Sequence, residues 1–256
     1  MSEIDTDPGA EPAQLYDRIK ARLLAYMPTP MQLLQINALA DELGTSTTPV
    51  REALTRLAAE RVIVYLPKKG FFAKTLSEDE LRELYIVNKT LLHCALHAKA
   101  TDGPRAMGAK KKDLHAGAWR NTDRSRITAT TNAAPKIAKV TPSPGVPQPD
   151  AGQLAQLTAQ LFVEIAMCSE NREVIEIVSN INDRLHHARV VEQHIIPGAR
   201  EELSQLDELH NAAQREEMLH ALVSYHERRL QFLSPICKEL LFRPFSSLGR
   251  NPASQG

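Results

Sequence analysis

Polar and basic side chains gather at the start of one short segment, residues 46–60, where they could contact a nucleic acid. Arginine can donate two hydrogen bonds to O6 and N7 of guanine, and Arg51 lies early in the helix that this segment predicts. Serine and threonine hydroxyls and the N–H groups of a helix N-terminus can hold phosphate. The candidate DNA-binding residues are Ser46, Thr47, Thr48, Arg51, Arg56, Lys68, Lys69 and Gly70, with Lys74 as a further phosphate contact.

The apolar residues of the same segment predict which side of the helix faces the protein core. The buried stripe consists of Val50, Ala53, Leu54 and Leu57. The polar residues near the helix N-terminus lie largely off this stripe. An α-helix about 10–12 Å wide fits the major groove of B-DNA, where its N-terminal residues reach base edges. Taken one at a time, Arg51 and Arg56 also fit the ordinary solvated surface of a helix.

Two helices before this segment and two strands after it are expected to hold it in place. Gly44 is expected to end the second helix, and Pro67–Gly70 to turn between the strands. The predicted strands are Val62–Tyr65 and Phe71–Lys74. The apolar stripe of the first helix consists of Leu15, Ile19 and Leu23, and that of the second helix consists of Ile36, Leu39, Ala40 and Leu43. Residues 13–76 therefore predict a winged helix-turn-helix DNA-binding domain with a small β-hairpin wing, after a disordered tail over residues 1–12.

A change in composition separates a further helix from the C-terminal part. The spacing of Ser77 and Glu80 predicts a capping box at the start of a helix over 77–100. Residues 101–152 hold six prolines and few large apolar side chains, so most of this insert is predicted to be disordered. Between residues 105 and 139 it carries nine Lys/Arg and two Asp/Glu. It is either an auxiliary arm that contacts DNA or a solvated linker.

Helical periodicity returns after the insert. It predicts helices near 153–168, 172–195, 200–213 and 215–241, and no strand pattern is visible among them. Residues 77–100 and 153–243 are therefore expected to form an all-helical bundle, followed by a tail over 244–256. The predicted fold class is mainly α, a winged helix-turn-helix joined to this bundle.

Composition excludes several classes of protein. The formal net charge is zero, so a DNA-binding face must come from local clustering, such as the nine Lys/Arg against five Asp/Glu in residues 13–75. The three cysteines stand singly, which is typical of a reducing cytoplasm. No apolar run is long enough for a membrane span, and no motif of a common enzyme class is present. We expect a soluble cytoplasmic protein that is not an enzyme.

Residues 13–75 resemble the winged helix-turn-helix of the GntR family of bacterial transcription regulators. The resemblance rests on LADELG at 39–44, TPVREAL at 48–54, RL at 56–57 and KGFF at 69–72. It implies a homodimer that binds a pseudo-palindromic double-stranded DNA operator and represses nearby genes until a metabolite releases it. It also implies that Arg51 reads bases and that Lys69 and Gly70 form the wing tip. Thr47 stands where the family commonly has arginine, so operator recognition should be weakened or redirected.

The C-terminal part resembles the FCD effector domain of the FadR subfamily. The resemblance rests on LSEDELRELYIVNKTLLHCALHA, LFVEIAMCSENREVIEIVSNINDRLHHAR and REEMLHALVSYHERRL. This domain often binds a divalent metal through an aspartate and three histidines. The corresponding positions here are Ala159, Val163, Leu206 and His226, and a single imidazole does not make a metal site. We therefore expect no metal or other cofactor, and an FCD-like effector and dimerisation domain that is degenerate at these positions.

A further expectation is an organic-acid effector bound inside the bundle. A guanidinium pairs readily with a carboxylate, and the candidate residues are Arg184, His187, Arg189 and His226. Helical phase does not show that they converge, and ordinary hydrogen-bonded helix residues are the alternative. Two functions follow: a metabolite-responsive repressor, or a DNA-binding regulator whose C-terminal domain has lost sensing and serves only dimerisation or a protein partner.

Overall fold

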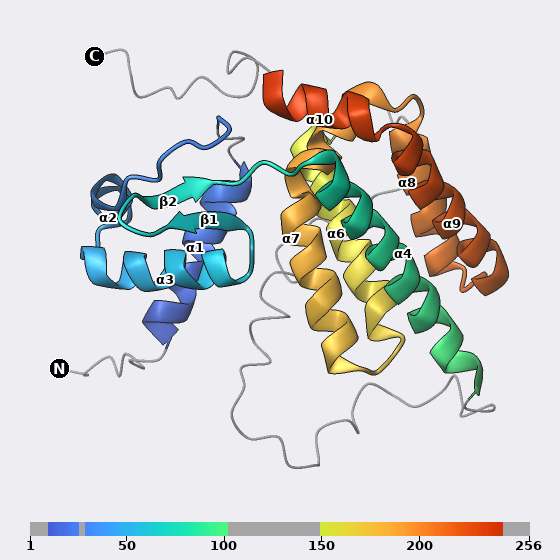
Figure 1. Ribbon diagram of the computed structural model, residues 1–256. Helices are drawn as coiled ribbons and strands as arrows, with labels where there is room; N and C mark the ends of the chain where they lie inside the picture. Colours follow the sequence, from blue (N-terminus) through green and yellow to red (C-terminus); the bar gives the residue numbers. More distant parts are fainter. Residues whose placement is uncertain (1–9, 26–28, 102–148, 243–256) are drawn as a thin grey trace, which may run out of the picture.

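The computed structural model describes residues 10–25, 29–101 and 149–242, which form an N-terminal domain and a helical bundle (Figure 1). The N-terminal domain holds α1 (Ala10–Ala25), α2 (Ile36–Leu43), α3 (Thr47–Ala59), β1 (Ile63–Leu66) and β2 (Gly70–Ala73). The bundle holds α4 (Glu78–Thr101), α6 (Ala151–Met167), α7 (Arg172–Ile195), α8 (Ala199–Asn211), α9 (Arg215–Gln231) and α10 (Leu233–Phe242). This is the predicted fold class.

The core of the N-terminal domain is built from the predicted stripes. Ile19, Val50, Leu54 and Leu57 are fully buried in one cluster. Gly44 ends α2 in the left-handed conformation, where its N–H donates to the Asp41 carbonyl. α1 begins at Ala10, so the tail predicted to reach residue 12 is shorter. Pro12 does not prevent this, because N–H groups in a first helical turn have no intrahelical partner.

The wing is an antiparallel hairpin whose strands are each shifted by one residue from the prediction. Ile63 pairs with Ala73 and Leu66 with Gly70. Residues 32–34 contact the other edge of β2: the Leu34 N–H donates to the Phe71 carbonyl at 2.8 Å, and the Ala73 N–H donates to the Gln32 carbonyl at 2.9 Å. This contact covers an otherwise open strand edge. The sequence pattern missed it because residues 32–34 show no strand alternation.

The bundle has two adjoining apolar clusters. One gathers α6, α8 and α9 around Phe162 and Leu222, and the other gathers α7 and α10 with the start of α4 around Leu185 and Ile236. The predicted capping box at Ser77 and Glu80 is present, with each residue's N–H donating to the other's side chain. A second capping box, Asp150 with Gln153, starts α6 at Ala151, two residues before the predicted start.

The predicted helix over 215–241 is two helices. α9 ends at Gln231, and α10 begins at Leu233. Pro235 explains the break, because a proline ring clashes with the carbonyl four residues earlier, which here belongs to Gln231. The predicted helix over 200–213 corresponds to α8 over Ala199–Asn211. The tail at 244–256, residues 1–9 of the N-terminal tail and residues 102–148 of the insert lie outside the described residues.

One polar face of α7 contacts the N-terminal domain. Nζ of Lys20 on α1 lies 2.9 Å from Oδ2 of Asp183, and the Asn180 side-chain amide donates to the Glu60 carbonyl at 2.8 Å. These contacts hold the C-terminal end of α3 near α7 while the N-terminal half of α3 points away from the bundle (Figure 1). Within the described ranges, no helix has the length and apolar character that a membrane crossing needs.

Candidate nucleic-acid interface

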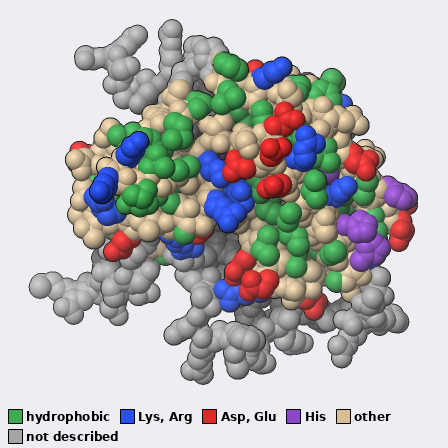
Figure 2. Space-filling model, viewed as in Figure 1, with side chains coloured by type: hydrophobic (Ala, Val, Ile, Leu, Met, Phe, Trp, Pro, Cys, Tyr) green, Lys and Arg blue, Asp and Glu red, His purple; other side chains and the backbone are tan. Residues whose placement is uncertain are grey.

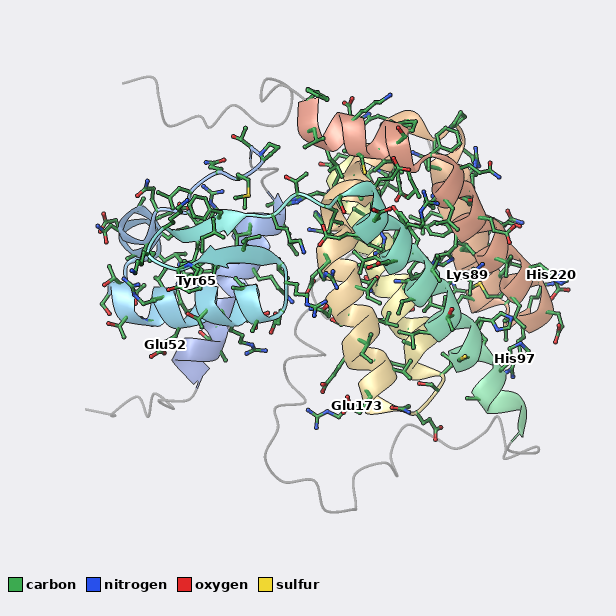
Figure 3. All side chains as sticks on the ribbon, in the orientation of Figure 1. Glu52, Tyr65, Lys89, His97, Glu173 and His220 are labelled. Carbon is green, nitrogen blue, oxygen red and sulfur yellow. The ribbon has the colours of Figure 1, made fainter. Side chains whose placement is uncertain are left out.

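The N-terminal half of α3 presents the predicted polar residues to solvent. Ser46, Thr47, Thr48 and Arg51 are all exposed, whereas Val50 and Leu54 on the other side are fully buried. Glu52 projects from the outer side of the same helix (Figure 3). The exposed half of α3 therefore has the shape and the donors that a major groove accepts.

The start of α3 offers backbone donors to an anion. Ser46 occupies the N-cap position with an extended backbone, but its hydroxyl makes no capping hydrogen bond. The first N–H groups of a helix have no intrahelical partner, and the helix dipole favours a negative charge there. Without a side-chain cap, these N–H groups and the Ser46 hydroxyl remain open to a phosphate.

The wing tip is a tight turn that holds two lysines outward. The Lys69 N–H donates to the Leu66 carbonyl at 3.0 Å. Lys68 has a φ of 63°, which is the left-handed conformation and costs a residue with a Cβ about 1–2 kcal/mol. Both lysines are exposed. Gly70 has a φ of 109°, and a Cβ there would lie 3.3 Å from Cδ1 of Leu33, so glycine is required for the turn.

Two predicted phosphate contacts, Arg56 and Lys74, also make ion pairs within the protein. Nε of Arg56 lies 2.9 Å from Oε1 of Glu60, and its guanidinium lies 4.0 Å from the centre of the Tyr16 ring. The Tyr16 hydroxyl donates to the same Glu60. Burial, followed by the hydrogen bond to Glu60, raises the pKa of Tyr16 far above its usual range. Arg56 therefore links α3 to α1 through its contacts with Glu60 and with the Tyr16 ring.

Lys74 is also paired. Its Nζ lies 2.7 Å from Oε1 of Glu80, and its side chain is only 16% exposed. This pair joins the end of the wing to the first turn of α4, a linking role that the sequence pattern did not reveal.

The four candidate effector residues separate into two places. Arg184 and His187 line a hollow between the domains, on the same face of α7 as Asn180 and Asp183. Arg189 and His226 lie inside the bundle beside the Phe162 ring, whose centre is 5.0 Å from the Arg189 guanidinium and 5.7 Å from the His226 ring. The expectation that all four face the bundle interior is wrong for Arg184 and His187.

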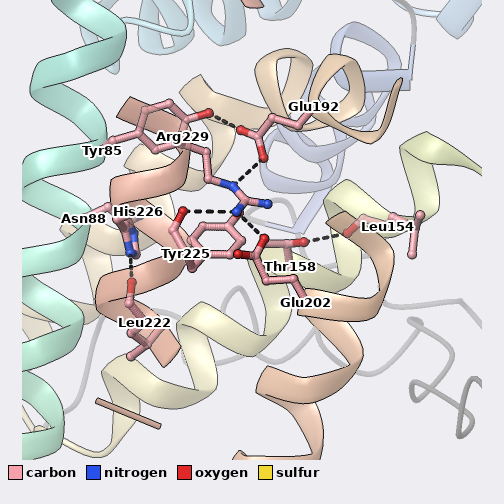
Figure 4. A network of polar contacts seen from close by, with 10 residues as sticks. All are labelled: Tyr85, Asn88, Leu154, Thr158, Glu192, Glu202, Leu222, Tyr225, His226 and Arg229. Carbon is pink, nitrogen blue, oxygen red and sulfur yellow. Dashed lines mark hydrogen bonds and ion pairs between the residues drawn. The ribbon is translucent and has the colours of Figure 1, made fainter. Parts of the chain in front are cut away.

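His226 is fully buried, and both of its ring nitrogens lie close to polar atoms of the bundle. Its Nδ1 donates to the Leu222 carbonyl at 2.7 Å, and its Nε2 lies 3.3 Å from Oδ1 of Asn88 (Figure 4). Asn88 is fully buried and was not singled out from the sequence. Burial lowers the pKa of His226 to about 3, so the ring is neutral at physiological pH. Ala159, Val163 and Leu206 offer no ligand atom, so these residues do not fit the divalent metal that the FCD resemblance implies.

Arg189 stands out as a buried charge without a polar partner. It is 1% exposed, and its three guanidinium nitrogens have no hydrogen-bond partner among the residues that the structure describes. Oδ1 of Asn182 in the same bundle is also buried without a hydrogen-bond partner among the described residues. An unpaired buried guanidinium is costly, and an organic anion would satisfy it. We refer to Arg189, Phe162, His226 and Asn88 as the Arg189 cluster.

Comparison with known proteins agrees with this geometry. Residues 12–73 match the sequence model of the gntR family of bacterial regulatory proteins. The Nta operon transcriptional regulator of Aminobacter aminovorans is 25% identical over 172 residues, which are 66% of this chain and 69% of that protein. An HTH-type transcriptional regulator in the TAR-I ttuE-ttuC' intergenic region of Agrobacterium vitis is 42% identical over 53 residues, 21% of this chain and 31% of that protein.

Solved structures share the fold over nearly the whole chain. A transcriptional regulator GntR from Rhodococcus sp. RHA1 aligns with a TM-score of 0.61 at 15% identity, covering 88% of this chain and 98% of its own. E. coli McbR/YncC aligns with a TM-score of 0.57 at 18% identity, covering 88% of this chain and 97% of its own. At these identities the likeness concerns the fold, a winged helix-turn-helix followed by a helical bundle.

Proposed function

We propose, from the premise that this chain is a DNA-binding transcriptional regulator with a gntR-family N-terminal domain and not an enzyme, that it is a metabolite-responsive repressor. In this proposal a homodimer binds a pseudo-palindromic operator. α3 of each protomer enters the major groove, and the wing tip contacts the adjacent backbone. The helical bundle belongs to the FCD type of the FadR subfamily and binds an organic acid that releases the DNA.

The DNA-binding role rests on the exposed polar side chains in the N-terminal half of α3. Arg51 is exposed and makes no ion pair among the residues that the structure describes, in contrast to Arg56 five residues later. An arginine that is neither buried nor paired can reach the edge of a guanine with both donors. Lys68 and Lys69 supply the sequence-independent part of the affinity through phosphates.

The test of this role is the substitution Arg51→Ala. We expect at least a tenfold loss of affinity for the operator recovered by sequencing DNA that co-purifies with the protein, because a bidentate arginine–guanine contact contributes about 1–3 kcal/mol. Arg82→Ala is the matched control, since Arg82 is also an exposed helical arginine but lies on α4 of the bundle. Equal operator affinity of the Arg51→Ala variant and the unaltered protein, measured by fluorescence anisotropy, would refute the base-reading role.

The observation that favours a working sensor over a domain kept only for dimerisation is the Arg189 cluster. A bundle that served dimerisation alone would gain stability by replacing an unpartnered buried arginine with an apolar side chain. A melting screen with organic acids addresses this directly. An acid that raises the melting temperature and weakens operator binding supports the sensor, whereas no response to any acid tested supports the alternative of a domain that has lost sensing.

A further inference from the structure

The hollow between the two domains is lined by an excess of positive charge. Arg61 and Lys74 reach it from the N-terminal domain, and Asp183, Arg184 and His187 reach it from α7. Figure 2 shows Lys and Arg side chains, with Asp and Glu side chains beside them, on the visible face where the two domains meet. We propose that this junction is a binding site for a small oxyanion, a carboxylate or a phosphate group, held between the guanidinium groups of Arg61 and Arg184.

The ion pairs at the junction leave these two guanidinium groups without a carboxylate. Lys74 is paired with Glu80 at 2.7 Å, and Asp183 is paired with Lys20 at 2.9 Å. Arg61 and Arg184 make no ion pair among the described residues, and Nε of Arg184 is buried without a hydrogen-bond partner there. Two unpaired guanidinium groups facing one hollow can bind one oxyanion from both sides.

The electrostatics of Arg184 favour the binding of an anion. Burial, followed by the positive charge of Arg61, lowers the pKa of Arg184, while Glu80 and Glu83 partly oppose this shift. Two like charges brought together in a partly desolvated place repel each other. An oxyanion between them would reverse this repulsion into attraction.

The walls of the hollow strengthen such a contact. Leu23, Leu24, Val62, Ile63 and Leu76 line it beside the charged groups. Apolar walls exclude water and lower the local dielectric constant, so each guanidinium–oxyanion contact is stronger than it would be on an open surface. The hollow is small, which favours a compact anion or the acidic end of a larger molecule.

The backbone at Arg61 indicates that its side chain has a role beyond the turn. Arg61 follows α3 with a φ of 60°, the left-handed conformation that glycine or asparagine adopts at less cost. The strain falls on Arg61, the charged residue of this turn that lines the hollow. Observed backbone strain at a ligand-facing residue is consistent with a binding site.

An anion here would join the DNA-binding domain to the bundle. Arg61 lies directly after α3, and Arg184 lies one turn from Asn180 on the face of α7 that contacts Glu60. Binding would add to the Lys20–Asp183 and Asn180–Glu60 contacts and fix the orientation of α3 relative to the bundle. Anion binding itself is independent of the proposed function. Only its effect on DNA affinity rests on that function.

The experiment is calorimetric titration of the full-length protein without DNA, using inorganic phosphate and succinate as probes at constant ionic strength set with sodium chloride. We expect one of the two to bind, and Arg184→Gln to weaken that binding at least tenfold. Arg61→Gly should weaken it to a similar extent while keeping or raising the melting temperature, because glycine relieves the left-handed strain. Lys238→Gln, at an exposed position on α10, is the control and should bind like the unaltered protein.

Each result has one interpretation. Binding of phosphate alone assigns the site to phosphorylated ligands, and binding of succinate assigns it to carboxylates. Binding of neither probe, or binding that survives both arginine substitutions and is lost in Arg189→Met, overturns the junction site. Operator affinity measured with and without the bound probe then tests the coupling separately. Unchanged DNA affinity with normal anion binding leaves the site standing and refutes only its effect on the DNA-binding domain.

Discussion

At the scale of single residues, two arginines of the same bundle have opposite surroundings. Arg189 and Arg229 are each 1% exposed. Nε of Arg229 donates to Oε2 of Glu192 at 2.9 Å, its Nη1 donates to Glu202 and to the Tyr225 carbonyl, and Glu192 also accepts from the Tyr85 hydroxyl (Figure 4). Burial alone would lower the pKa of Arg229, but its acidic neighbours raise it overall. Arg229 is thus a structural residue, whereas the guanidinium of Arg189 has no hydrogen-bond partner among the described residues, which supports the anion-binding role proposed for it.

This contrast predicts opposite effects of one substitution at two positions. Arg229→Met should lower the free energy of unfolding by about 3–5 kcal/mol, because it leaves the fully buried Glu192 without its counter-charge. Arg189→Met should raise it by about 1–3 kcal/mol, because it removes a charge with no hydrogen-bond partner. Urea denaturation of the two variants measures both. A destabilised Arg189→Met protein would mean that Arg189 contributes to the fold and would weaken its assignment to a ligand.

The buried neutral His226 predicts a loss of stability in acid. Its pKa is lowered from 6.5 to about 3, chiefly by burial, so between these values the unfolded chain binds a proton that the folded chain does not. The contribution of His226 is therefore complete above pH 6.5 and falls as the pH drops toward 3, by at most about 1.4 kcal/mol per pH unit. Urea unfolding at pH 7, 6 and 5 should give a shallower pH slope for His226→Asn.

The control for this titration is His220→Asn. His220 lies on the same helix but is exposed (Figure 3), so its substitution should leave the pH slope unchanged. If His226→Asn kept the full slope, buried His186, whose pKa is also lowered to about 3 by burial and by the nearby His187 and Arg189, would be the group responsible.

At the scale of elements, α3 and the wing are proposed to contact different parts of the DNA. α3 is fixed to α1 through Arg56, Glu60 and Tyr16, so its N-terminal half is presented on a rigid support. The wing tip presents its lysines through a turn in which Lys68 has a positive φ. A point charge on a flexible stem contacts phosphates and cannot read bases, so the wing should add affinity without specificity.

Lys69→Ala tests this division. We expect weaker binding to the operator and to unrelated duplexes by the same factor, together with a salt dependence whose slope falls by about one phosphate contact. Anisotropy titrations at several salt concentrations on both kinds of duplex measure this. A loss confined to the operator would place Lys69 among the base-reading residues instead.

At the scale of the whole molecule, one α3 covers too few base pairs for a specific site, and a two-fold dimer would place two of them one helical turn of DNA apart. The bundle is the expected interface, because the N-terminal domain commits its free face to DNA. Ile86 and Val87 on α4 are large apolar side chains with 44% and 45% exposure, which is consistent with a surface covered by a second copy.

Sedimentation equilibrium at micromolar concentration should therefore give twice the 28.5 kDa mass of one chain. Val87→Lys should shift the equilibrium toward monomer without lowering the melting temperature of the N-terminal domain, whereas Lys238→Gln on α10 should not. A monomer for the unaltered protein would contradict the dimeric operator complex. A dimer that resists Val87→Lys would place the interface elsewhere on the bundle.

The sequence by itself determined the elements and the face that each one buries. The stripe of Val50, Leu54 and Leu57 and the stop at Gly44 follow from local chemistry, because the helical repeat and the freedom of glycine act within a few residues. For the same reason the exposed position of Arg51 could be predicted. Pro235 also indicates the break between α9 and α10, although the apolar periodicity continues past it and predicted a single helix.

Only the tertiary structure decided which partner each polar residue has. Periodicity predicts that a residue faces inward, but it does not say what lies opposite when that neighbour is distant in sequence. Arg229 is paired with Glu192, whereas Arg189 lies against the Phe162 ring and has no hydrogen-bond partner among the described residues. Arg184, five residues before Arg189 on the same helix, faces the N-terminal domain instead of the bundle interior. The choice among these partners depends on how α7 packs between the two domains, which local sequence chemistry does not determine.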